Sequence, residues 1–115
     1  MIDQVSPADL DAWIQSQAGA GAKALVLDVR EPWELETASI GPHASYELLA
    51  IPMNEVPARL AELDPDRPLA CLCHHGARSM RVASFLAGHG FGRLANIAGG
   101  IDAWSQQLDA SVPRY

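Results

Sequence analysis

The chain has 115 residues and a mass of 12.3 kDa, and a chain of this length can bury one hydrophobic core but not two. Its 49% hydrophobic and 19% charged residues exclude disorder and fibrous repeats and indicate one globular domain over residues 1–115. Fourteen acidic against eight basic residues give a formal charge of -6. This charge disfavours nucleic acid and anionic membrane surfaces as partners, and we expect a monomer.

The N-terminal residues and the two cysteines indicate the compartment. Residues 1–9 lack the cationic and apolar segments of a signal peptide, and no apolar run approaches the roughly 20 residues of a spanning helix. We therefore expect a cytoplasmic protein, and the excess of arginine over lysine is typical of a GC-rich bacterial genome. In a reducing compartment Cys71 and Cys73 stay as thiols, and a disulfide between them would close a very tight ring.

The first third of the chain predicts a helix and then a buried strand. Residues 6–9, Ser-Pro-Ala-Asp, are typical of a helix start, and an apolar stripe formed by Leu10, Trp13 and Ile14 follows. We expect the glycines of residues 19–21 to end this helix. Residues 24–27 are a short apolar run typical of a strand buried on both faces.

The rest of the chain alternates helices and strands. Residues 32–36 predict a short helix, and residues 38–46, with a Gly-Pro turn signal, predict a loop. Further strands are predicted over residues 48–53, 69–72 and 94–97. Three further helices are predicted from apolar residues at helical spacing. The first carries Val56, Leu60 and Leu63, and the last carries Ile101, Trp104 and Leu108. The middle one carries Val82, Phe85, Leu86 and His89, and Gly88 and Gly90 are expected to end it.

This alternation favours a mainly parallel sheet of about five short strands with helices on both faces, a three-layer α/β fold. Ligands of such open sheets bind beyond the carboxyl ends of the strands. The loop over residues 73–78 follows a predicted buried strand directly and is therefore the first place to look for a site.

Residues 73–79, Cys-His-His-Gly-Ala-Arg-Ser, have the composition of an anion-binding turn. Backbone N–H groups converge where a strand leads into a helix, and with Arg78 they stabilise Cys73 as a nucleophilic thiolate. Gly76 permits the backbone conformations of a tight cradle, and Ser79 can cap the helix or hydrogen-bond the sulfur.

Two other interpretations of these residues are weaker. Cys71 lies inside an apolar run and is interpreted as a small core residue. Four zinc ligands within residues 71–75 cannot all reach one tetrahedral ion without distorting the chain, so we predict no metal site.

Three stretches of the chain resemble the rhodanese (thiosulfate sulfurtransferase) family. Residues 25–31, Leu-Val-Leu-Asp-Val-Arg-Glu, resemble the first strand of the family and the turn after it. Residues 73–79 resemble its active-site loop, and residues 99–104, Gly-Gly-Ile-Asp-Ala-Trp, its C-terminal signature. Residues 39–45 depart from the Gly-His-Ile segment of many members, so His43 is assigned no role.

The resemblance implies a single-domain rhodanese-like fold and a sulfurtransferase. Cys73 is then the catalytic nucleophile, and a sulfane sulfur passes from a donor such as thiosulfate through a Cys73 persulfide to an acceptor, with no cofactor. The acceptor is cyanide in vitro and a small thiol or thiol protein in the cell. The persulfide cradle comprises His74, His75, Gly76, Ala77, Arg78 and Ser79.

Two alternative functions stay open. The chain can be a persulfide-carrying or protein-binding module with little turnover, or a phosphatase or arsenate reductase of the same fold. Those phosphatases have five residues between cysteine and arginine, whereas Cys73 and Arg78 are separated by four, so sulfur transfer is favoured.

Several residues outside the loop have structural interpretations. Asp28 and Arg30 are expected to form an ion pair or strand-end hydrogen bonds under the active-site loop. The three tryptophans are expected to lie in the core or to cover the sheet. The segment over residues 112–115 can dock on the domain or on a partner.

Overall fold

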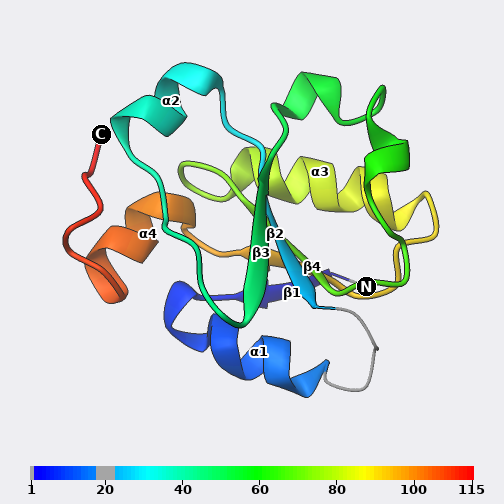
Figure 1. The fold of residues 1–115 in the computed structure, drawn as a ribbon, viewed down its shortest axis with the longest axis horizontal. Helices are drawn as coiled ribbons and strands as arrows, with labels where there is room; N and C mark the ends of the chain where they lie inside the picture. The colour runs from blue at the N-terminus through cyan, green and yellow to red at the C-terminus, as the bar shows by residue number, and fades with distance from the viewer. Residues whose placement is uncertain (1, 18–22) are drawn as a thin grey trace.

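The computed structural model describes residues 2–17 and 23–115. Its centre is a five-stranded sheet in the order β1-β5-β4-β2-β3, in which every pair is parallel (Figure 1). The strands are β1 (Ile2–Val5), β2 (Ala24–Asp28), β3 (Tyr46–Ala50), β4 (Leu69–Leu72) and β5 (Leu94–Ile97). The predicted three-layer α/β fold is confirmed. The predicted helix end at residues 19–21 lies outside the described residues.

Helices cover both faces of the sheet. On one face lie α1 (Leu10–Ser16), preceded by a 3-10 turn (Pro7–Asp9), and α4 (Gly100–Gln107). The other face carries α3 (Ala77–Ala87) and two 3-10 turns (Met53–Glu55 and Leu60–Glu62). The short α2 (Pro32–Thr37) follows β2. Among the described residues, no helix has the length and apolarity needed to cross a bilayer.

Alternation along the central strands divides the core into two clusters. In β2, Val26 packs with the α1 and α4 cluster, and Leu27 packs with the α3 cluster. In β4, Leu72 packs with the α1 and α4 cluster and Cys71 with the α3 cluster. Successive residues alternate in this way because their side chains point to opposite faces of the sheet. Cys73, two residues beyond Cys71, therefore lies on the face covered by α3.

The parallel register brings the segments after β2 and β4 to the same end of the sheet, where the strands have their carboxyl ends. Asp28 pairs with Leu72, so the residues after β2 and those after β4 leave the sheet side by side. The backbone N–H of Val29 continues the ladder by donating to the carbonyl of Leu72 at 2.9 Å. The segment with Arg30 and the loop that begins at Cys73 are thus neighbours.

Two predicted elements differ from the structure. The strand expected over residues 48–53 is present as β3, which begins earlier, at Tyr46, and ends at Ala50, although the N–H groups of Ile51 and Met53 still donate to the carbonyls of Asp28 and Val29 at 3.0 Å. The helix expected around Val56 is replaced by the two 3-10 turns, since Pro57 lacks the N–H that a helix needs. Edge strand β1 was not predicted, because Asp3 and Gln4 are exposed and break its apolar pattern.

Two further expectations need correction. The helix α3 begins at Ala77 and so includes Ala77 and Arg78, which were predicted to be in the loop, while His89 lies beyond its end. Trp33 is 60% exposed, unlike the buried Trp13 and Trp104, because it lies at the start of the peripheral α2.

Candidate active site

The loop between β4 and α3 holds Cys73 at its base. Gly76 adopts φ +105, a left-handed conformation that favours glycine, and caps the N-terminus of α3. A Cβ on Gly76 would also lie 3.2 Å from the backbone N of Gly99. This turn reverses the chain over Cys73 and directs the Gly76 N–H inward.

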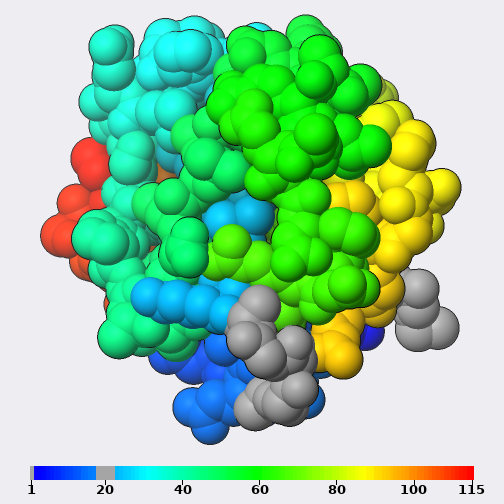
Figure 2. Space-filling view, turned by 45° about the vertical axis from the view of Figure 1, so that its right-hand side comes forward, coloured from blue at the N-terminus to red at the C-terminus, as the bar shows by residue number. Residues whose placement is uncertain are grey.

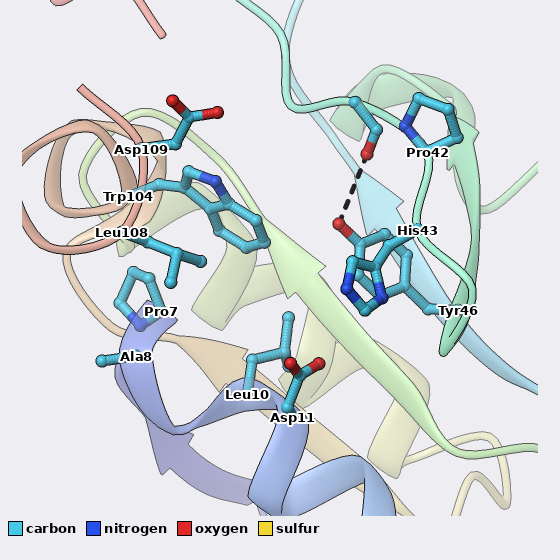
Figure 3. Close-up of a pocket in the computed structure, with 11 residues that line it drawn as sticks. Pro7, Ala8, Leu10, Asp11, Pro42, His43, Tyr46, Trp104, Leu108 and Asp109 are labelled. Carbon is cyan, nitrogen blue, oxygen red and sulfur yellow. Dashed lines mark hydrogen bonds between the residues drawn. The ribbon is translucent and has the colours of Figure 1, made fainter. Parts of the chain in front are cut away.

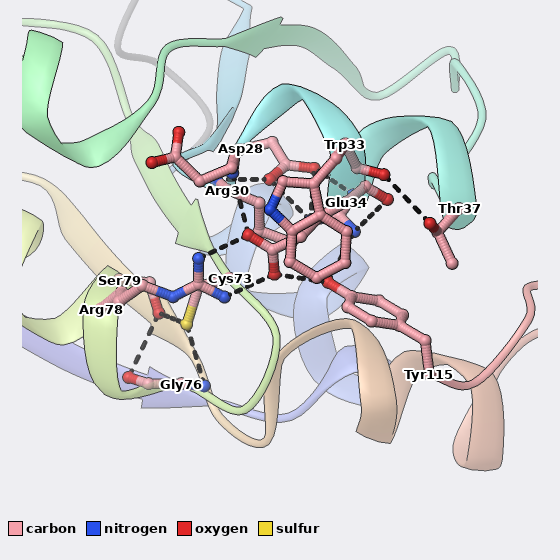
Figure 4. A network of polar contacts seen from close by, with 11 residues as sticks. Asp28, Arg30, Trp33, Glu34, Thr37, Cys73, Gly76, Arg78, Ser79 and Tyr115 are labelled. Carbon is pink, nitrogen blue, oxygen red and sulfur yellow. Dashed lines mark hydrogen bonds and ion pairs between the residues drawn. The ribbon is translucent and has the colours of Figure 1, made fainter.

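The sulfur of Cys73 has two polar neighbours. The Gly76 N–H donates to Cys73 Sγ at 3.0 Å, and Ser79 Oγ lies 3.2 Å from the same sulfur (Figure 4). Ser79 is the third residue of α3, so it does not cap the helix, and its hydroxyl also reaches Asn96 Oδ1. The hydroxyl also lies 3.2 Å from the carbonyl of Gly76. Its single proton can serve only one of Asn96, this carbonyl and the sulfur at a time, so Ser79 can turn toward a thiolate when one forms.

The N-terminus of α4 holds the loop from behind. The N–H groups of Ile101 and Asp102 donate to the carbonyls of Cys73 and His74 at 2.8 and 3.1 Å. Gly100 has φ +61, and a Cβ there would overlap both carbonyls. The Gly-Gly sequence at residues 99–100 therefore allows α4 to approach the loop backbone.

Arg78 forms a two-pronged ion pair with Glu34 of α2. Its Nη1 and Nη2 donate to Glu34 Oε2 and Oε1 at 2.6 and 2.7 Å. Glu34 is 3% exposed, and its hydrogen bonds with the Arg78 guanidinium outweigh burial and lower its pKa to about 2. The same carboxylate raises the pKa of Arg78. Both groups are therefore charged at neutral pH.

The expected ion pair between Asp28 and Arg30 is present. Arg30 Nη2 lies 2.7 Å from Asp28 Oδ2, and Arg30 is fully buried. Arg30 Nη1 also donates to the carbonyl of Glu34 at 3.2 Å. The pair thereby connects the end of β2 to the helix that carries Glu34.

The two histidines of the loop lie in different environments. His74 Nε2 is buried without a hydrogen-bond partner among the described residues, and burial, followed by the neighbouring His75, lowers the pKa of His74. Its ring stacks on that of His75 with centroids 3.9 Å apart. The side chain of His75 is 66% exposed and its Nδ1 lies 3.9 Å from Asp102 Oδ2.

The structure thus brings Gly76 and Ser79 to the sulfur of Cys73, whereas the Arg78 guanidinium is bonded to Glu34, and His75 and Ala77 are exposed. Two residues that the sequence did not single out complete the site, Glu34 and Asn96. Asn96 could have been found from sequence, since it is a polar residue inside an apolar strand, whereas Glu34 meets the loop only through tertiary contacts. Tyr115 also joins the site, and its segment, residues 112–115, docks on the domain, which is one of the two outcomes expected for it.

A separate cavity of about 340 Å³ lies between α1, α4 and the segment before β3 (Figure 3). Trp104, Leu10 and Tyr46 line it, and the Tyr46 hydroxyl donates to the carbonyl of Gly41 at 3.3 Å. None of the residues predicted for the persulfide cradle borders this cavity.

Comparison with known proteins identifies the domain. The family model described as "Rhodanese-like domain" matches residues 6–107. A sulfurtransferase of Allochromatium vinosum is 38% identical over 82 residues, which cover 71% of this chain and 72% of that protein. A rhodanese-related protein of Thermoplasma volcanium has a solved structure that superposes with a TM-score of 0.71, at 32% identity over 92% of this chain and 93% of that one.

A further relative belongs to a longer protein. The rhodanese-like/PpiC domain-containing protein 12 of Arabidopsis thaliana chloroplasts is 39% identical over 93 residues, which cover 81% of this chain and 31% of the plant protein. The relatives named as sulfurtransferases support a sulfurtransferase-type function. By its family match over residues 6–107, the chain belongs to the rhodanese-like domain family.

Proposed function

We propose that the chain moves a sulfane sulfur from a donor such as thiosulfate to a nucleophilic acceptor through a persulfide on Cys73. The observation that carries this proposal is the Gly76 N–H that donates to Cys73 Sγ at 3.0 Å. A backbone N–H directed at the sulfur stabilises a thiolate and, after it, an anionic persulfide. The covalent persulfide takes the place of a cofactor.

In the first step the Cys73 thiolate attacks the outer sulfur of thiosulfate. The new bond joins Cys73 Sγ to that sulfur, the S–S bond of thiosulfate breaks, and sulfite leaves with its electron pair. The negative charge on Cys73 moves to the terminal sulfur of the persulfide. No proton and no external oxidant or reductant is needed.

In the second step an acceptor attacks the terminal sulfur of the persulfide. Cyanide is expected to serve in vitro, and a thiolate of a small molecule or a protein in the cell. The bond between the two sulfurs of the persulfide breaks, and Cys73 leaves as the thiolate that began the cycle. The acceptor departs as thiocyanate or as a new persulfide.

Arg78 is proposed to orient the sulfonate of the donor. Two of the five guanidinium N–H groups point to Glu34, and three others remain for oxygen atoms of a ligand. Held in place by Glu34, the guanidinium presents these donors without reorganising, and they can disperse charge on the departing sulfite.

The size of the cradle favours transfer of a single sulfur atom over transfer of a phosphoryl group. Four residues separate Cys73 from Arg78, and Cys73 is 1% exposed. A single sulfur atom placed on Sγ needs less room than a tetrahedral phosphoryl group. Phosphate hydrolysis and arsenate reduction are therefore the weaker alternatives.

The test is the mass of the intact protein after incubation of the reduced chain with thiosulfate. Wild type is expected to gain one sulfur atom and to lose it when cyanide or a small thiol is added. Cys73→Ser should gain none, and Cys71→Ala, the matched cysteine control, should behave like wild type.

Three results would count against this proposal. If wild type gains no sulfur while Cys73 is still alkylated by iodoacetamide, the nucleophile is available and the donor chemistry is wrong. If the persulfide forms but no acceptor removes it, the chain is a carrier module with little turnover. Hydrolysis of an aryl phosphate by wild type would favour the phosphatase alternative.

A further inference from the structure

The segment after α4 returns to the active-site loop. Val112 is buried, and its carbonyl accepts a hydrogen bond of 2.6 Å from Ser105 Oγ of α4. Arg114 Nε donates to Asp102 Oδ1 at 2.9 Å. Figures 1 and 2 show this segment, in red, beside the region of α2. These anchors direct the side chain of Tyr115 into the space between α2 and the loop.

The hydroxyl of Tyr115 connects two charged groups of the site. Arg30 Nη1 lies 3.0 Å from it and can only donate, so the hydroxyl oxygen accepts there. Its own proton then goes to Glu34 Oε1 at 2.8 Å (Figure 4). The hydroxyl is thus fixed from both sides, and its direction of donation is determined.

This hydrogen bond completes the coordination of the Glu34 carboxylate. Oε1 accepts from Tyr115 and from Arg78 Nη2, and Oε2 accepts from Arg78 Nη1 and from the backbone N–H of Glu31 at 2.9 Å. Four donors occupy the four favourable positions around the carboxylate. Its plane, and therefore the plane of the Arg78 guanidinium, has one preferred orientation.

The ring of Tyr115 contacts the other end of the same loop. It stacks on the ring of His74 with centroids 3.9 Å apart and an interplanar angle of 7°. Trp33 meets the Tyr115 ring edge-on at 6.0 Å. One side chain therefore contacts His74, the residue next to Cys73, and is linked through Glu34 to Arg78.

We infer that Tyr115 is a positioning residue of the sulfur-transfer site, which through Glu34 holds Arg78 in the orientation that receives the anionic donor. The kinetic consequence of this inference rests on the proposed function. Tyr115 should matter for the first step, in which Cys73 is loaded with sulfur from thiosulfate. It should not matter for the second step, the discharge of the persulfide to a thiol, because the sulfonate group has already left as sulfite.

The test compares Tyr115→Phe with Tyr46→Phe. The first variant removes the hydroxyl and keeps the stack on His74, whereas the second removes a tyrosine hydroxyl that donates to the carbonyl of Gly41 and lies at the separate cavity. We expect the rate constant for persulfide formation from thiosulfate to fall about three- to tenfold in Tyr115→Phe, less than the full effect of one hydrogen bond to a charged group, because Tyr115 acts on the donor only through Glu34 and Arg78. Tyr46→Phe should load at the wild-type rate, and discharge to a thiol should change less than twofold in both variants.

A double-variant comparison separates positioning from a general loss of structure. In an Arg78→Ala background, Tyr115→Phe should no longer slow loading, because the residue acts through Arg78. Equal slowing with and without Arg78 would overturn the inference. So would a wild-type loading rate in Tyr115→Phe, whereas failure of wild type itself to load would overturn the proposed function.

A measurement that needs no catalytic turnover also tests whether Tyr115 restrains Arg78 through Glu34. Rotation about the Nε–Cζ bond of Arg78, followed by NMR of its guanidinium nitrogens, should be slow in wild type and several-fold faster in Tyr115→Phe. Unchanged rotation in that variant would overturn the inference, whether or not thiosulfate is a donor.

Discussion

Arg78 and Glu34 join the active-site loop to α2 through two parallel hydrogen bonds of 2.6 and 2.7 Å. Glu34 is almost fully buried, while the side chain of Arg78 is 31% exposed. The arginine therefore has two roles, one in stability and one in donor binding, and measurements of unfolding and of persulfide formation can separate them. It neutralises a buried carboxylate, and in the proposed mechanism it orients the donor.

Removal of Arg78 should affect both stability and loading. Arg78→Ala leaves the Glu34 carboxylate without its main partner, and we expect a loss of about 2 to 3 kcal/mol in the free energy of unfolding, since a buried charge without its partner is costly. Loading from thiosulfate should fall at least tenfold. Urea unfolding and intact-mass kinetics measure the two effects.

The double variant Arg78→Ala/Glu34→Gln separates these effects. Removing the negative charge should restore most of the lost stability, because burying a neutral amide costs less free energy than burying an unpaired carboxylate. Loading should stay as slow as in Arg78→Ala. Recovery of loading together with stability would show that the arginine has only a structural role.

The pKa of Glu34 predicts an acid-sensitive step in stability. Its folded-state pKa of about 2 lies below the ordinary value of 4.5, so the folded protein binds fewer protons than the unfolded chain between these values. The stabilisation is fully present above pH 4.5 and is lost as the pH falls toward 2; the difference in pKa corresponds to roughly 3 kcal/mol.

Unfolding by urea at several pH values between 7 and 2.5 measures this effect. Glu34→Gln should flatten the profile below pH 4.5. Glu36→Gln, on the exposed side of the same helix, should leave the profile unchanged. An identical slope in wild type and Glu34→Gln would mean that other carboxylates cause the acid sensitivity.

Local sequence was enough to predict the strand and loop that carry Cys73. Residues 69–72 are apolar and lie in the centre of the sheet, and the residues that contact the sulfur, Gly76 and Ser79, lie three and six positions after it. Such contacts follow from the geometry of one loop. The family resemblance of residues 25–31 and 99–104 supplied the arrangement around it, which the comparisons confirm.

The charge partners of the loop could not be predicted in this way. Glu34 is 44 positions from Arg78, and Tyr115 is 81 positions from Glu34. Several acidic residues of the chain could have served equally well on sequence grounds. Only the parallel register that places α2 beside the loop selects Glu34, and only the path of the segment after α4 selects Tyr115.

Gly100 should be among the least replaceable residues of the chain. With φ +61 and no room for a Cβ beside the carbonyls of Cys73 and His74, Gly100→Ala is expected to lower the free energy of unfolding by about 2 to 4 kcal/mol. Gly92→Ala is the matched control, because nothing lies within 4 Å of a Cβ there. Similar thermal unfolding midpoints for the two variants would contradict the close approach of α4 to the loop.

The two cysteines should differ in reactivity although both are buried. Burial raises the pKa of the Cys71 thiol, and the neighbouring Cys73 adds to this effect, so Cys71 stays protonated at neutral and mildly alkaline pH. Cys73 instead has the Gly76 N–H and the Ser79 hydroxyl at its sulfur. Iodoacetamide at pH 8 should therefore modify the folded protein once, on Cys73, and should modify it twice after unfolding in urea.

Peptide mapping identifies the labelled thiol, and prior loading with thiosulfate provides an internal check. A persulfide on Cys73 should direct the reagent to its terminal sulfur, and a reductant should then release the label together with that sulfur. Cys71→Ala should keep the single modification and the sulfur gain at a modest cost in stability, since it removes one buried sulfur atom. Loss of the sulfur gain in Cys71→Ala would instead mean that the second thiol takes part in the transfer.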